Sequence, residues 1–287
     1  MEILFMGTAA AEGVPALFCE CEICKNARVV RGKEVRGRSG SLIDGKLKVD
    51  FGPDSFKQML DYDVDYTHMH SLLVTHSHED HFAIGDILCR RKGFGQVSDP
   101  VPLTVYGNGA VGDMLAPYLC DRIAFRQMKP FESVAIEGYT VTALEAVHCL
   151  SSAENAKWPV EFDGKSYTRS EEALFYLIEK DGKSLLYAHD TDEFTPADME
   201  FLKGKKIDMI TLDCTNGAYF FDYIGHMSAE DNMRLRDRLI EIGAADEHTV
   251  FVANHFSHNG LVKHEELEEK MPGFIVSYDG LKLKIGD

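Results

Sequence analysis

One short segment constrains this chain more than any other: SLLVTHSHEDHF, where four residues of metal-ligand type follow an apolar run within six positions. These residues are His76, His78, Asp80 and His81. Alternate residues of an extended segment point to the same side, so His76 and His78 can hold one cation together. Asp80 and His81, where the chain is expected to turn into a helix, point elsewhere and suit a second cation. A loop that is rich in histidine by chance is the alternative, but it gives these side chains no packing role.

The remainder of the chain reads as short strands with few helices. Two strand pairs are predicted around Glu137-Gly138 and Asp181-Gly182, which are hairpin signals between apolar runs. Ser228, followed three residues later by Asp231, predicts a capped helix, and further helices are expected over 108–119 and after Asp80. The other segments that predict strands are EILFMGT, SGSLIDG, KLKVDFG, SLLVTH, PLTVYG, IDMITLDC, HTVFVANH and FIVSYDGLKLKI.

No linker, repeat or low-complexity segment divides these 287 residues, so a single domain over 1–287 is expected. Strands in both halves, each half closed by amphipathic helices, predict two sheets packed face to face with helices outside. The formal net charge of -17 disfavours nucleic acid and anionic lipid as partners. A small phosphorylated substrate is less affected, because a metal ion can set the local field. The N-terminus lacks signal-peptide features and no stretch reaches membrane-spanning length, so a soluble cytoplasmic protein is expected.

The His-x-His-x-Asp-His motif resembles the hallmark of the metallo-β-lactamase superfamily. That superfamily adds a histidine, an aspartate and a last histidine after later strands. Here LEAVHCL supplies His148, LLYAHDTDEF supplies Asp190 and VFVANHFSHNG supplies His255. The resemblance implies an α/β (α+β) fold, the four-layer αββα sandwich. It also implies metal-dependent hydrolysis, because the flavo-diiron branch, which reduces oxygen, carries a glutamate where this chain has His78.

Carried over by position, the resemblance implies a site for two divalent metals, which could be zinc, manganese or iron. It implies that His76, His78 and His148 bind one metal. Asp80, His81 and His255 would bind the other, with Asp190 between the two. Since two close cations repel, a shared carboxylate and a shared hydroxide would stabilise the pair, and the hydroxide is the expected nucleophile.

Three cysteines, Cys19, Cys21 and Cys24, cluster near the start of a chain that has seven. In a reducing compartment such a cluster favours metal binding over disulfides. The three thiolates are one ligand short of a tetrahedral zinc site. His258 is the candidate for the fourth ligand, because it follows His255 by three residues and needs another purpose. A structural zinc in an N-terminal loop at 19–24 is therefore expected; three buried or redox-active cysteines without metal are the alternative.

The opening GTAAAEGVPALFCECEICKNAR and the ending HFSH resemble the PhnP-type cyclic phosphodiesterases of phosphonate-degradation operons, and a related pattern opens the PqqB family. The first resemblance implies that small cyclic phosphates, such as phosphoribosyl cyclic phosphate, are hydrolysed. It implies a catalytic role for Asp80 and for His226, which lies just before the Ser228-capped helix. An imidazole at a helix N-terminus can bind a phosphate oxygen or protonate the leaving alkoxide. A surface histidine is the alternative.

Other functions stay open on the sequence alone. They are a PqqB-like role in quinone cofactor biosynthesis, a lactonase or thioesterase, an RNA-processing nuclease of the same superfamily, and a non-catalytic metal-binding protein. The segment 149–172 is longer than the resemblance leads us to expect. It is either a lid insertion over the pocket or a surface hairpin around Asp163-Gly164. A homodimer is compatible with the sequence.

Overall fold

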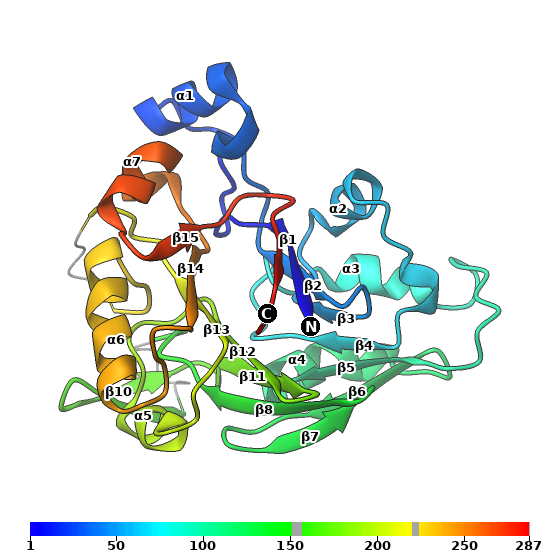
Figure 1. Ribbon diagram of the computed structural model, residues 1–287. Coiled ribbons are helices and arrows are strands. Elements are labelled where there is room, and N and C mark those ends of the chain that lie inside the picture. The colour runs from blue at the N-terminus through cyan, green and yellow to red at the C-terminus, as the bar shows by residue number, and fades with distance from the viewer. Residues whose placement is uncertain (151–156, 220–223, 287) are drawn as a thin grey trace.

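The computed structural model describes residues 1–150, 157–219 and 224–286. Over these residues the chain forms two seven-stranded mixed sheets that pack face to face (Figure 1). The first sheet has the order β16 (Lys282–Lys284), β1 (Glu2–Gly7), β2 (Gly40–Ile43), β3 (Leu47–Val49), β4 (Ser71–Leu73), β5 (Leu103–Gly107) and β6 (Ile123–Gln127). The second has the order β15 (Phe274–Val276), β14 (Val250–Asn254), β13 (Met209–Asp213), β12 (Lys183–Ala188), β11 (Leu174–Lys180), β8 (Tyr139–Glu145) and β7 (Ser133–Ile136).

An apolar core fills the space between the two sheets. Phe5 and Leu73 of the first sheet share one buried cluster with Tyr176, Leu185 and Val252 of the second. Burial of such side chains contributes about 1.5–3 kcal/mol each to folding, so this layer holds the sheets together.

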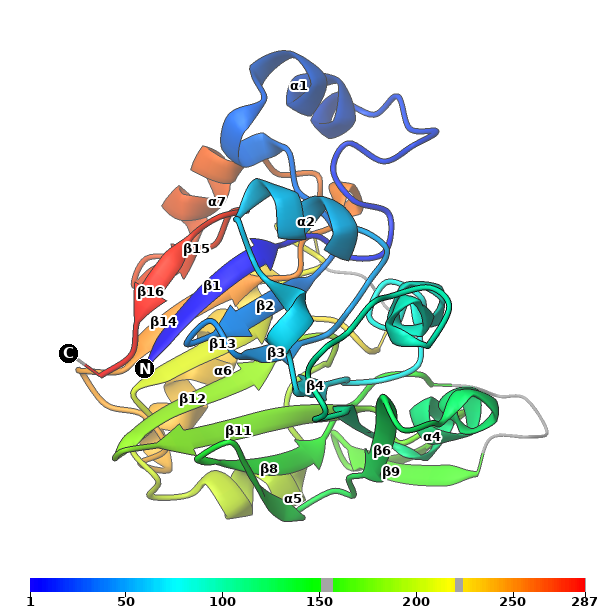
Figure 2. The ribbon, with the colours of Figure 1, turned by 90° about the vertical axis from the view of Figure 1, so that its right-hand side faces the viewer.

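Helices cover the outer face of each sheet, as Figures 1 and 2 show. Leu202, Leu235 and Leu267 pack from α5, α6 and α7 onto the second sheet. Ile87 and Val111 pack from α3 and α4 onto the first. The four-layer αββα sandwich expected from the sequence is confirmed. The helices are α1 (Glu22–Val30), α2 (Ser55–Asp61), α3 (Ile84–Ile87), α4 (Gly109–Leu115), α5 (Pro196–Leu202), α6 (Ala229–Glu241) and α7 (His264–Lys270).

The hairpin turns lie where their dipeptides predict. Glu137-Gly138 joins β7 to β8, and Asp181-Gly182 joins β11 to β12. All four residues have positive φ, which a type I′ turn requires. Asp163-Gly164 likewise has positive φ and closes a separate hairpin of β9 (Trp158–Phe162) and β10 (Lys165–Arg169). The described part of the expected lid therefore forms a hairpin, while 151–156 lies outside the described residues.

The capping box at Ser228 is confirmed: its hydroxyl accepts a hydrogen bond from Asp231 N, and the Asp231 carboxylate accepts one from Ser228 N. The last expected strand differs, because FIVSYDGLKLKI is divided between the sheets. Its first part is β15 of the second sheet, and its last part is β16 beside β1 of the first sheet. Asp279 holds the turn between them by accepting hydrogen bonds from Gly37 N and Thr8 Oγ1.

The helix expected after Asp80 is α3, which spans four residues. The helices α1, α2, α5 and α7 were not anticipated; three of them span seven residues, too short for a clear apolar period. No helix in the described ranges has the length and apolar character needed to cross a bilayer.

Lys48, on β3, is a fully buried amine in the first sheet. Its Nζ donates to the carbonyl oxygens of Asp50, at 2.6 Å, and Val49, at 3.3 Å. Burial lowers the pKa of Lys48 to about 7, from 10.5, and the nearby Asp50 carboxylate opposes that shift only in part.

Replacing Lys48 with Met should therefore change the pH dependence of stability. Between pH 7 and 10.5 the unfolded chain keeps a proton on Lys48 that the folded protein has lost, so this group's contribution to the free energy of unfolding rises with pH. Relative to wild type, Lys48→Met should be most stable near pH 7 and lose that advantage by up to ~1.4 kcal/mol per pH unit above it. Urea unfolding at several pH values measures this; a constant difference would mean an ordinary Lys48 pKa.

Candidate metal centre

The strand order of the second sheet brings three polar residues to one edge. β12, β13 and β14 are parallel neighbours, so the residues at their carboxyl ends lie side by side. Asp190 follows β12, Asp213 ends β13 and His255 follows β14. Asp190 and His255 both have left-handed backbone conformations, with φ of 55° and 62°. Non-glycine residues adopt this conformation rarely, and such strain gathers at functional sites.

The facing edge of the first sheet supplies Asp50 and the 75–81 segment, and β8 of the second sheet leads to His148. β3 and β4 are parallel, so Asp50, which follows β3, lies beside the 75–81 segment that follows β4. His148 follows β8, which runs in the same direction as β12 because both are antiparallel to β11. The seven predicted ligand residues of the active site therefore gather at one end of the sandwich.

The first cluster consists of His76, His78 and His148. His78 Nδ1 lies 2.9 Å from His76 Nε2 and 3.4 Å from His148 Nε2. Asp190 completes the cluster, with Oδ2 3.3 Å from His76 Nε2 and Oδ1 3.5 Å from His148 Nε2. Donors bound at ~2.0–2.1 Å around a tetrahedral ion stand about 3.3 Å apart, so these spacings fit a metal. His78 is exposed and its partners are buried, which leaves this cluster open toward solvent.

The second cluster consists of Asp80, His81 and His255, again with Asp190. His81 Nε2 lies 3.2 Å from Asp80 Oδ2, 3.3 Å from His255 Nε2 and 2.8 Å from Asp190 Oδ2. All four residues are buried. The Oδ2 atom of Asp190 faces histidines of both clusters, so this carboxylate lies between them.

The ligand atoms of each cluster are better arranged to bind a cation than to hydrogen-bond to one another. Asp190 Oδ1 is buried without a hydrogen-bond donor in suitable geometry. Unpaired buried polar atoms are rare and need a partner. Imidazole nitrogens face one another at 2.9 Å (His76 Nε2 and His78 Nδ1) and 3.3 Å (His81 Nε2 and His255 Nε2), a spacing that suits donors around one cation. These residues could hold two metals.

Outer partners fix the second nitrogen of each buried histidine ring, which sets its tautomer. His81 Nδ1 lies 2.8 Å from Asp50 Oδ2, and His76 Nδ1 lies 3.0 Å from Thr75 Oγ1. His148 Nδ1 lies 3.2 Å from the Gly225 carbonyl oxygen. Each of these rings therefore turns Nε2 toward the clusters.

Asp213, at the end of β13 in the second sheet, supports the second cluster. Its Oδ2 lies 3.1 Å from His255 Nδ1 and accepts a hydrogen bond from Asp190 N at 3.2 Å. Burial would raise the pKa of Asp213, but the adjacent His226 and His255 hold it well below its usual range. Asp213 and Asp50 were missed in the sequence, although VDFG and LDCT each place an aspartate directly after an apolar strand, as LLYAHD does for Asp190.

His226 lies inside the site, and its side chain is 18% exposed. Its Nδ1 is 3.2 Å from both Asp190 Oδ1 and Asp213 Oδ2. Burial lowers the pKa of His226, but the carboxylates of Asp213, Asp190 and Asp192 together raise it to about 9. The structure therefore places His226 beside the clusters and not on a surface loop.

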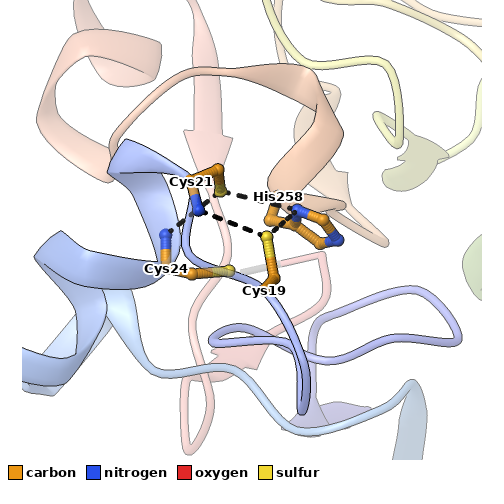
Figure 3. A group of neighbouring side chains, drawn as sticks. All are labelled: Cys19, Cys21, Cys24 and His258. Atoms are coloured by element: carbon orange, nitrogen blue, oxygen red, sulfur yellow. Dashed lines mark hydrogen bonds between the residues drawn. The ribbon is translucent and has the colours of Figure 1, made fainter.

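The cysteine cluster is a separate site, shown in Figure 3. His258 Nδ1 lies 3.4 Å from Cys19 Sγ and 3.6 Å from Cys21 Sγ. Cys24 completes the group, and all four ligand atoms lie within 4.8 Å of one another. The cysteines form no disulfide. Cys21 also caps α1, because its Sγ accepts a hydrogen bond from Cys24 N.

His68, His70 and His189 belong to neither cluster. His68 and His70 pair with Asp99, outside the clusters. His189 is fully buried and hydrogen-bonded to Thr211 and Asn254, so it is not a surface residue.

The arginines nearest the sequence motifs have structural partners. Arg36 bonds Thr8 and His264, and Arg38 pairs with Asp54. Arg90 donates to the Val101 carbonyl oxygen. None of these four partners belongs to the two clusters.

Replacing Asp50 with Asn should weaken metal binding at the second cluster by ~10–100-fold, because an amide cannot accept from Thr75 and His81 as the carboxylate does. Metal content after dialysis against a graded chelator would measure the loss. Asp61→Asn, at an exposed position of α2, is the control. Unchanged retention of metal in Asp50→Asn would contradict this role.

Comparison with known proteins agrees with this geometry. A diphosphatase of the PhnP family superposes with a TM-score of 0.73 at 21% identity, over 99% of this chain and 98% of that one. Zn²⁺-bound PqqB from Methylobacterium extorquens also gives 0.73, at 20% identity, over 99% and 100%. The short form of human tRNase Z gives 0.60, at 14% identity, over 100% of both chains. At these identities the similarity establishes the fold alone.

No curated protein matches the chain in sequence. A family model described as "Beta-lactamase superfamily domain" matches residues 49–241, more than half of the chain. The matched region contains Asp50, the His-x-His-x-Asp-His motif, His148 and Asp190. On this match, and on the sandwich and its neighbours, the chain belongs to the metallo-β-lactamase superfamily.

Proposed function

We propose that this protein is a phosphodiesterase that uses two metals to hydrolyse small cyclic phosphates, with phosphoribosyl cyclic phosphate as the leading candidate. Members of the superfamily are metal-dependent hydrolases. The observation that carries the proposal is the pair of clusters around Asp190, with His226 beside them. This arrangement combines ligands for two cations with a histidine, His226, that lies beside Asp190, Asp213 and His255 and could donate a proton.

The first cluster would hold one divalent metal, the second cluster would hold the other, and Asp190 would serve both. Zinc, manganese and iron all accept these ligands. When bound, such a pair lowers the pKa of water, supplies a hydroxide nucleophile and offsets charge on phosphoryl oxygens. Asp80 orients the second cluster, since its carboxylate adjoins His81.

His226 would protonate the leaving oxygen. Asp213 lies against Nδ1 and fixes the ring, so a protonated His226 has a second N–H, on Nε2, for the substrate. Its place just before α6 adds the favourable field of a helix N-terminus for a phosphate.

The sequence opening and the cysteine set favour a PhnP-like substrate over other substrates of the superfamily. The PhnP-family neighbour is named a diphosphatase, so cleavage of another phosphorus–oxygen bond is a related candidate. A PqqB-like role remains the alternative from a different class, because that neighbour is similar to the same extent. The net charge of -17 disfavours RNA as a substrate. We also propose a cytoplasmic location, to which the free thiols are suited.

Phosphorus NMR of the metal-replete protein would test the substrate. The panel is phosphoribosyl cyclic phosphate, a cyclic nucleotide, a linear diester and a diphosphate. Opening of the sugar cyclic phosphate in preference to the others supports the proposal. If metals are bound and every diester stays intact, the phosphodiesterase proposal is wrong, and lactones, thioesters and the quinone-biosynthesis role become the candidates.

Replacing His226 with Ala should lower kcat for the cyclic phosphate by ~10²–10⁴-fold, because protonation of the leaving oxygen is lost. Metal content should stay as in wild type, since His226 belongs to neither cluster. His248→Ala, at an exposed position, is the matched control and should keep full activity. Near-normal turnover in His226→Ala would exclude the acid role.

We further propose that Cys19, Cys21, Cys24 and His258 hold a structural zinc. Sulfur-to-nitrogen spacings of 3.4 and 3.6 Å match those around a tetrahedral zinc with bonds of ~2.3 Å to sulfur and ~2.0 Å to nitrogen. Such a zinc would tie the 19–24 loop to the segment that carries His255.

Cys21→Ser and His258→Ala should each release one zinc equivalent and lower the thermal unfolding midpoint, while the two active-site metals remain. Elemental analysis beside thermal unfolding would measure both effects. Cys89→Ser, at an exposed cysteine, is the control. Equal loss of metal from all sites would contradict a division into separate structural and catalytic sites.

A further inference from the structure

Glu171 is a buried carboxylate at the end of the 149–172 segment, and it is 5% exposed. Its Oε2 accepts hydrogen bonds from Ser77 N at 3.1 Å and Asn108 Nδ2 at 2.8 Å. Its Oε1 accepts from Ser77 Oγ at 2.8 Å. Ser77 is the residue between His76 and His78, so Glu171 is hydrogen-bonded to the loop that carries both histidines.

The same carboxylate reaches the loop of the third histidine through Cys149. The Cys149 backbone has a φ of 56°, and its Sγ lies 3.6 Å from Glu171 Oε1. The thiol also lies 3.8 Å from His78 Nε2. Since His78 turns Nδ1 toward the first cluster, its Nε2 carries the hydrogen. This fixes the direction of the two hydrogen bonds: His78 donates to the Cys149 sulfur, and the Cys149 thiol donates to Glu171.

The hairpin of β9 and β10 is hydrogen-bonded to Cys149 and to the end of β8. Ser170 N donates to the Cys149 carbonyl oxygen at 2.9 Å. The buried Arg169 donates to the Ala146 carbonyl oxygen at 2.9 Å and to Glu145 Oε1 at 2.7 Å. The end of the segment is thus bound to the end of β8, from which His148 follows.

The second cluster has different supports. Asp50 lies behind His81 and Asp213 lies behind His255, whereas Glu171 contacts Ser77, Asn108 and Cys149. Asp50 therefore supports His81 directly and reaches His76 only through Thr75, whereas Glu171 holds the loop of His76 and His78 directly.

We propose that Glu171 and Cys149 are positioning residues of the first cluster, which set its metal affinity independently of the second cluster. This inference rests on the proposed two-metal function. Glu171 holds the 76–78 loop against the loop of His148, and Cys149 orients the ring of His78. Cys149 and residues 169–171 then act as supports for the ligands.

The variants separate the effect of the hydrogen bonds of Glu171 from the effect of its charge. In Glu171→Gln, the amide oxygen can still accept from Ser77 N and Asn108 Nδ2, and its NH₂ can donate to Ser77 Oγ and the Cys149 sulfur. Glu171→Ala loses every one of these bonds. Cys149→Ala removes only the thiol that bridges Glu171 and His78, and it leaves the bonds of Glu171 to Ser77 and Asn108 in place. Glu172→Gln, at the neighbouring half-buried residue, is the matched control.

The test is competition of Zn²⁺ against a graded series of chelators, with binding to each cluster resolved as a separate step. His255→Ala, which removes a ligand of the second cluster and none of the first, identifies the step of the second cluster. Glu171→Ala should weaken the other step by ~10–100-fold and leave the step that depends on His255 unchanged. Cys149→Ala should weaken the same step by a smaller factor, and Glu171→Gln should restore most of the affinity.

Two results would overturn the inference: no change in Glu171→Ala, or equal weakening of both steps with a lower unfolding midpoint, which a purely structural role would give. If Glu171→Ala does not fold, Cys149→Ala alone decides, and an unchanged first step in it excludes the link. Failure of the wild-type protein to bind metal at the two clusters would instead contradict the proposed function.

Discussion

The whole site depends on one buried carboxylate, Asp190, placed between two groups of histidines. Its Oδ2 is 3.3 Å from His76 Nε2 and 2.8 Å from His81 Nε2, so a single anion faces both clusters. A buried charge of this kind is tolerated only when opposite charge or hydrogen bonds compensate it. Asp190 Oδ1 has no hydrogen bond of suitable geometry, although His226 Nδ1 and His148 Nε2 lie 3.2 and 3.5 Å from it. The surrounding histidines offset the charge of Asp190, and a metal bound at these residues would offset it further and stabilise the fold.

Each sheet contributes an aspartate that supports its side of the site. Asp50, after β3, accepts from Thr75 N and Thr75 Oγ1 and lies against His81. Asp213, at the end of β13, accepts from Thr215 N and Thr215 Oγ1 and lies against His255. In both cases the carboxylate fixes a threonine-containing turn and a histidine at once. The second cluster thus joins the two sheets through matched supports.

How much could be predicted from sequence depends on whether a signal is local. His76, His78, Asp80 and His81 are dense in sequence, and the Glu137-Gly138 and Asp181-Gly182 turns carry their own conformational preference. Single aspartates after strands are common, so Asp50 and Asp213 gain meaning only from the parallel neighbours that the sheet order gives them. Glu171 is similar: its neighbour in space, Ser77, is 94 residues away in the chain. The division of the last strand between the sheets also depends on distant contacts, made by Asp279.

The segment from His255 to His258 belongs to two sites at once. His255 lies in the second cluster, and three residues later His258 lies against Cys19 and Cys21. Between them, Phe256 N donates to the Thr8 carbonyl oxygen, and Ala10 N donates to the Phe256 carbonyl oxygen, so the N-terminal loop is bound to this segment along its backbone. His255 must hold a left-handed conformation with φ of 62°. A metal at the cysteine cluster would fix His258, at one end of this short segment. It would thereby help to hold His255, at the other end, in its strained conformation.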